Sequence, residues 1–83
     1  MVTAEQIRAA RAALRWTIED LSSETSISVR TIKRIESSLG IASAHSQTVH
    51  AIQRALEAAG VEFIGTPDDA PGIRLRSPSR DEG

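Results

Sequence analysis

Residues 17–36 read TIEDLSSETSISVRTIKRIE, and this stretch holds two short helical patterns separated by a few turn-forming residues. Thr17 lies three residues before Asp20, a spacing typical of a helix N-cap. Acidic side chains in the first turn also favour the helix dipole. The pattern therefore predicts a helix over about 18–24.

The residues Ser26-Ile27-Ser28 interrupt this helix, because serine hydroxyls bond nearby backbone groups in turns and caps. Ser28 is the predicted cap of a second short helix over about 29–37. Ile32 and Ile35 fall on one side of that helix, which we expect to be buried. The opposite side carries Val29, Arg30, Lys33 and Arg34.

Two further helices flank this pair. Thr3 and Gln6 form a capping-box pattern that predicts a helix over about 4–14. An apolar stripe predicts a longer helix over about 47–59, which Gly60 ends.

The C-terminal part has a different pattern. Apolar and polar residues alternate over 61–64 and 73–76, and the residues between them are rich in glycine, proline and aspartate. This predicts a β-hairpin, so the fold class is mainly α, with four to five short helices and a C-terminal hairpin. The expected division of the chain is 1–60 for the helical domain, 61–76 for the hairpin and 77–83 for a disordered tail.

Composition excludes several classes of protein. The chain has 83 residues and no cysteine, so disulfides and cysteine-based zinc sites are absent. No apolar run approaches the ~20 residues that span a bilayer. No basic segment followed by a long apolar one begins the chain, so we expect a cytoplasmic protein without a signal peptide.

Charge and chemistry narrow the function further. Residues 1–54 carry a net charge of +2 and residues 55–83 a net charge of −3, which leaves room for one local basic face. We expect no metal site, because His45 and His50 have no cysteine or suitable carboxylate nearby. No glycine-rich phosphate loop and no nucleophile motif occurs, so we expect neither a cofactor nor an enzyme.

The helix-turn-helix stretch resembles the lambda-repressor-like, XRE-family (Cro/CI-type) transcriptional regulators, and the resemblance extends over roughly residues 4–76. It implies a lambda-repressor-like fold and a double-stranded DNA operator as partner. The implied base contacts are Val29, Arg30, Lys33 and Arg34, because arginine binds guanine bidentately in the major groove. The implied phosphate contacts are Thr17, Ser28 and Thr31. Arg11 and Glu36 are the implied structural ion pair.

Three positions depart from the family pattern. Ile18 occupies the position at which this family usually has a glutamine that binds a phosphate. Ser22 occupies a position at which the family usually has alanine. Ser26 stands where the turn usually has glycine, often at positive φ, so we expect a cost in backbone strain there.

The hairpin has two interpretations. One recognition helix reads about four base pairs, so a homodimer on a two-fold symmetric operator is expected. Pairing across the two-fold axis would bury Phe63, Ile64, Ile73 and Leu75. Alternatively, the hairpin folds back on the 47–59 helix and covers its own core.

The sequence predicts a transcriptional regulator, and one mode of action is repression by competition with RNA polymerase or another regulator at overlapping operators. Activation through Glu19 and Asp20 is the other mode of regulation. The basic residues of the 29–37 helix also fit a merely solvated face. A different class of function is a protein-interaction module, an antitoxin or antagonist, built on the same fold.

Overall fold

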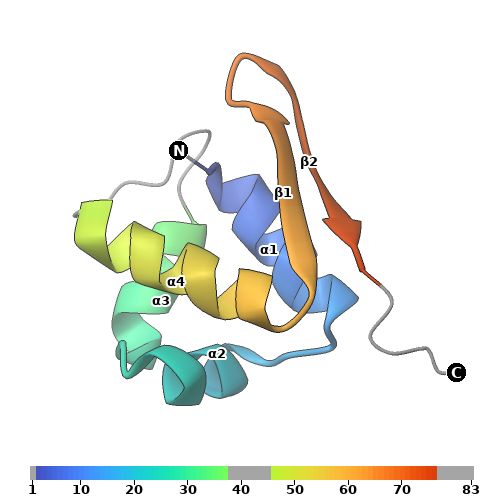
Figure 1. Cartoon of the computed structure of the whole chain (residues 1–83). Helices are drawn as coiled ribbons and strands as arrows, with labels where there is room; N and C mark the ends of the chain where they lie inside the picture. The colour runs from blue at the N-terminus through green and yellow to red at the C-terminus, as the bar shows by residue number, and fades with distance from the viewer. Residues whose placement is uncertain (1, 38–45, 77–83) are drawn as a thin grey trace, which may run out of the picture.

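The computed structural model describes residues 2–37 and 46–76. Within these ranges the chain forms four helices followed by a two-stranded antiparallel sheet (Figure 1). The elements are α1 (Ala4–Ala13), α2 (Ile18–Thr25), α3 (Val29–Glu36), α4 (Ser46–Ala58), β1 (Val61–Thr66) and β2 (Asp69–Leu75). The mainly helical architecture with a C-terminal hairpin is thus confirmed. Two predictions, the disordered tail over 77–83 and the absence of a metal site at His45, fall on residues outside the described ranges.

Side-chain caps fix the start of each of the first three helices. Thr3 and Thr17 each accept a hydrogen bond from the backbone N–H three residues on, at 3.0 Å in both cases. In turn, the side chains of Gln6 and Asp20 accept a hydrogen bond from the backbone N–H of Thr3 and Thr17, so both capping boxes are complete. Ser28 accepts from the N–H of Thr31 at 3.2 Å.

One apolar core joins all the helices to the first strand. Its fully buried centre contains Ile7 of α1, Leu21 of α2, Ile32 and Ile35 of α3, and Ile52 and Leu56 of α4. Val61, at the start of β1, belongs to the same cluster. Because α2 and α3 both contribute buried side chains to this core, the core fixes the position of the helix-turn-helix pair.

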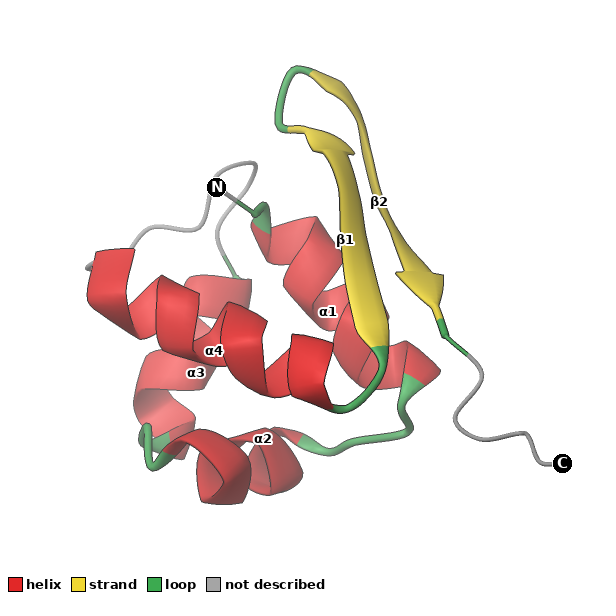
Figure 2. Ribbon diagram, in the orientation of Figure 1, coloured by secondary structure: helices red, strands yellow, loops and turns green. Residues whose placement is uncertain are grey.

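The strands are longer than the sequence predicts. The residues expected to form a turn over 65–72 largely continue the two strands, leaving Pro67 and Asp68 as the turn. Gly65 makes this continuation feasible, because its φ of 76° allows an irregularity in β1 between Ile64 and Thr66. Figure 2 shows the hairpin crossing one side of the helices, with its tip projecting beyond α1.

Gln6 fastens the hairpin to α1. Its buried side-chain amide donates to the carbonyl of Ile64 at 3.0 Å and to that of Gly72 at 2.8 Å. The amide oxygen of the same side chain accepts from the N–H of Thr3. A single polar residue therefore joins the cap of α1 to both strands.

No helix in the described part of the chain is long and apolar enough to cross a membrane.

Candidate nucleic-acid interface

Helix α3 separates its apolar and cationic residues on opposite faces. Ile32, Ile35 and Glu36 are buried, whereas Arg30, Lys33 and Arg34 are exposed. Lys33 and Arg34 follow Arg30 by three and four residues, so the three cations lie on one face of the helix within about one turn. The only acidic residue of α3 is the buried Glu36. The exposed face is therefore uniformly basic.

The remaining predicted contacts surround the first turn of α3. Val29 is half-buried beside the basic face. Ser28 is exposed, and its hydroxyl donates to the hydroxyl oxygen of Thr31 at 3.0 Å. The hydroxyl hydrogen of Thr31 stays available to a phosphate oxygen, whereas that of Ser28 is already used.

Two arginines of α1 hold the C-terminal end of α3. The Arg11 guanidinium donates to both carboxylate oxygens of Glu36, through Nε at 2.9 Å and through Nη2 at 2.8 Å. Arg8 donates to the backbone carbonyl of Glu36, where a cation is favourable to the helix dipole. The structure thus brings together the predicted pair Arg11 and Glu36.

The pair is partly shielded from water. The Glu36 side chain is 6% exposed and the Arg11 side chain 22%. The hydrogen bond to Glu36 raises the pKa of Arg11 above its ordinary value, against the lowering effect of burial. Arg11 also donates to the carbonyl of Trp16 at 3.1 Å, which ties the end of α1 to the approach of α2.

The turn between α2 and α3 contains the expected backbone strain. Ser26 has φ 62° and ψ 21°, the left-handed conformation in which glycine is usual. Two hydroxyls fix the next residue, Ile27. Ser22 Oγ donates to its carbonyl at 2.6 Å, and Thr25 Oγ1 accepts from its N–H at 3.2 Å.

Sequence reasoning missed this use of Ser22 and Thr25. The available signal was the presence of two hydroxyl residues just before a turn that lacks glycine. Their hydrogen bonds satisfy the N–H and the C=O of Ile27 and so help to fix the turn that orients α3 relative to α2.

The start of α2 is less favourable to phosphate than predicted. Thr17 is exposed, but its backbone N–H already donates to the carboxylate of Asp20 at 2.8 Å. Glu19 adds a second exposed carboxylate to this turn. Ile18 packs against the core, so its side chain takes part in folding. The donors that remain for a phosphate are the Thr17 hydroxyl hydrogen and the backbone N–H groups of the first turn of α2.

The predicted dimer residues divide into two groups. Phe63 and Ile73 pack against the protein's own core, as the fold-back interpretation expects. Ile64 is half-buried, and the Leu75 side chain is 49% exposed. Fold-back therefore accounts for Phe63 and Ile73 and leaves Leu75 uncovered.

Comparison with known proteins supports the interpretation of the helical pair. Residues 6–39 match the model of a family described as a helix-turn-helix domain. The matched segment spans most of α1 and the whole of α2 and α3. No curated protein matches the chain. A helix-turn-helix domain indicates DNA as the partner.

Proposed function

We propose that this protein is a sequence-specific DNA-binding transcriptional regulator of the lambda-repressor-like, XRE type, which places α3 in the major groove. The observation that carries the proposal is the uniformly basic exposed face of α3, formed by Arg30, Lys33 and Arg34 within a helix-turn-helix domain. An α-helix fits the major groove, and arginine binds guanine O6 and N7 there. Acting as a homodimer on a two-fold symmetric operator, the protein represses by occupying sites that polymerase or another regulator needs.

The distribution of charge restricts how the protein approaches DNA. Glu19, Asp20 and Glu24 are exposed on α2, where they repel phosphate. Attraction is therefore concentrated on α3. With about three cations at phosphates or bases, each subunit contributes a salt slope no steeper than about −3 in log K against log salt.

The test measures binding to a selected site and to a scrambled duplex across a salt series. The selected site comes from a random DNA pool enriched for bound fragments, which also reveals symmetry and spacing. A two-fold site with half-site centres about 34 Å apart is expected. A flat salt response would instead indicate the protein-interaction module.

Arg30→Ala tests the role of the basic face. It should weaken binding to the selected site by about 1–3 kcal/mol, roughly 5- to 150-fold, and weaken binding to scrambled DNA by a smaller factor, so that the preference for the selected site falls. The control is Arg54→Ala, which removes an exposed arginine from α4, outside the helix-turn-helix pair. Equal effects of the two substitutions would contradict the proposal.

A further inference from the structure

The exposed side chains of α3 offer hydrogen-bond donors without acceptors. Arg30 and Lys33 are exposed, and neither side chain bonds another residue in the part of the chain that the structure describes. Arginine and lysine side chains carry N–H donors and no acceptor. The helix, VRTIKRIE, also contains no asparagine or glutamine, whose amides present a donor and an acceptor together.

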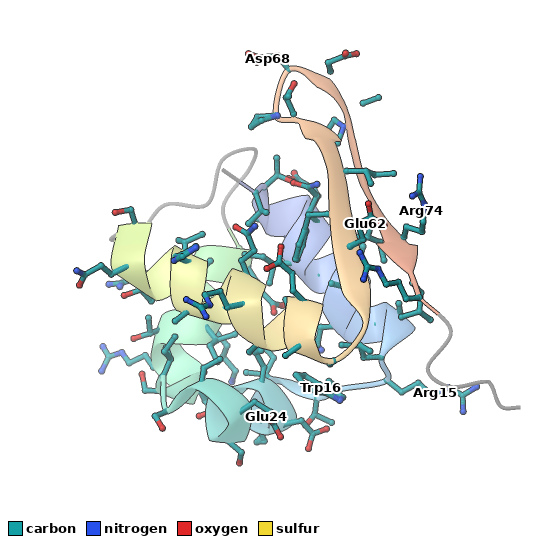
Figure 3. All side chains as sticks on the ribbon, viewed as in Figure 1. Arg15, Trp16, Glu24, Glu62, Asp68 and Arg74 are labelled. Atoms are coloured by element: carbon teal, nitrogen blue, oxygen red, sulfur yellow. The ribbon has the colours of Figure 1, made fainter. Side chains whose placement is uncertain are left out.

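The carboxylates of the helix pair are not available to a base. Glu36 of α3 is 6% exposed, and both of its oxygens accept hydrogen bonds from Arg11. The exposed carboxylates belong to α2, on which Figure 3 shows Glu24, and the other two are Glu19 and Asp20. The first helix of a helix-turn-helix crosses the DNA backbone, so these carboxylates lie near phosphates and not near base edges.

Two half-buried side chains complete the exposed face of α3. Val29, the first residue of the helix, is apolar and can contact only an apolar group of a base. The Thr31 hydroxyl accepts from the Ser28 hydroxyl at 3.0 Å and keeps its own hydrogen. A hydroxyl bonds bases of either kind or a phosphate, so Thr31 does not discriminate among base pairs.

A face with donors only is selective among the four bases. In the major groove guanine presents two acceptors, N7 and O6, whereas adenine presents an acceptor beside an amino donor and cytosine an amino donor. An adenine or cytosine amino group placed against Arg30 or Lys33 would meet a second donor and stay unpaired. Thymine presents one acceptor and a methyl group, which Val29 can contact.

We propose that the protein recognises its half-site through guanine, with Arg30 and Lys33 each bound to a guanine and Val29 against the methyl group of a neighbouring thymine. One helical turn advances about 5.4 Å and one base-pair step about 3.4 Å, so the two guanines lie about one or two base pairs apart. No base of the half-site is recognised through its amino group. The inference rests on the proposed function, because it names the bases that the same face binds.

The first test uses the wild-type protein and the site selected from the random pool. Each guanine is replaced in turn by 7-deazaguanine, which lacks the N7 acceptor and keeps Watson–Crick pairing. Replacement of a bound guanine should weaken binding at least about fivefold, whereas replacement outside the half-sites should have no effect. A selected half-site of A·T pairs only, or a site at which no 7-deazaguanine weakens binding, would overturn the inference.

Coupling between side chain and base identifies which residue binds which guanine. Arg30→Ala should abolish the effect of 7-deazaguanine at one position and keep it at the other, and Lys33→Ala should do the reverse. Arg54→Ala, which removes an exposed arginine from α4, should keep both effects. Circular dichroism checks that each variant is folded. If both α3 variants keep both effects, the cations bind phosphates only and the inference is wrong.

The methyl contact has its own test. Deoxyuridine in place of thymine removes only the methyl group, and it should weaken wild-type binding about two- to fourfold, the effect of one buried methyl group. Val29→Ala should bind the thymine and deoxyuridine duplexes equally. The same loss in both proteins would contradict the role of Val29.

A salt series separates this inference from the proposed function. If binding falls steeply with salt but no guanine is recognised, the inference fails while DNA binding stands. If binding is insensitive to salt, both fail.

Discussion

Replacement of Arg11 by methionine tests what fixes the orientation of α3. Arg11→Met leaves the Glu36 carboxylate, 6% exposed, without the guanidinium that donates to both of its oxygens. Breaking a buried ion pair by removing one partner costs about 3–5 kcal/mol. Because Arg11 itself is 22% exposed, we expect the lower end, about 3 kcal/mol. A small domain has about 5–15 kcal/mol of total stability, so this loss is large.

Urea and thermal unfolding can measure the loss. Trp16 is the only tryptophan and is half-buried near the pair, so its fluorescence reports the transition alongside circular dichroism. For a chain of this size, about 3 kcal/mol corresponds to a fall in Tm of roughly 12–24 °C. The urea m-value should stay constant if the folded state keeps its compactness.

The double variant Arg11→Met with Glu36→Met decides the cause. An apolar replacement of both partners is often neutral, so it should recover at least half of the loss. Glu62→Gln removes the carboxylate that meets Arg74 at 3.3 Å on the exposed face of the hairpin, and it should cost no more than about 1 kcal/mol. If Arg11→Met costs as little as Glu62→Gln, or if the double variant recovers nothing, the reasoning is refuted.

Three further substitutions test the turn and the hairpin. Ser26→Gly should raise the free energy of unfolding by about 0.5–1 kcal/mol, because glycine adopts positive φ without strain; a lower urea midpoint would contradict this. Ser22→Ala should lower that free energy by about 1 kcal/mol through loss of the bond to the Ile27 carbonyl, with the near-ultraviolet spectrum kept as a check on the fold. Gly65→Ala should disrupt the hairpin, because a Cβ would lie 2.2 Å from the Ala70 carbonyl oxygen, whereas Gly72→Ala meets only Ile64 at 3.7 Å and should fold normally. Equal Tm values for the two alanine variants would show that the hairpin tip adjusts freely.

Local sequence patterns predicted most of the helical fold. The capping boxes of Thr3 and Thr17 mark the starts of α1 and α2 correctly, because a cap is a contact within one turn. The segregation of Ile32 and Ile35 from the cations of α3 likewise follows from helical periodicity alone. Such features require no knowledge of distant parts of the chain.

Contacts between residues far apart in the sequence could not be predicted from local patterns. The two bonds from Gln6 to the hairpin join residues 58 and 66 positions apart, and no local pattern marks them. Arg11 and Glu36 were paired only through the family resemblance. The strand lengths were missed because Gly65, Pro67 and Gly72 indicate turns individually, while the backbone uses Gly65 as an irregularity within β1.

The Gln6 amide also determines how the molecule opens. Because this side chain bonds the cap of α1 through its oxygen and both strands through its nitrogen, we expect the hairpin and the first turn of α1 to open together. Protection against amide hydrogen exchange should therefore be similar in the first turn of α1 and in the middle of β1, as expected of a single cooperative foldon. A hairpin whose amides exchange far faster than those of α1 would instead mark it as an independently opening flap.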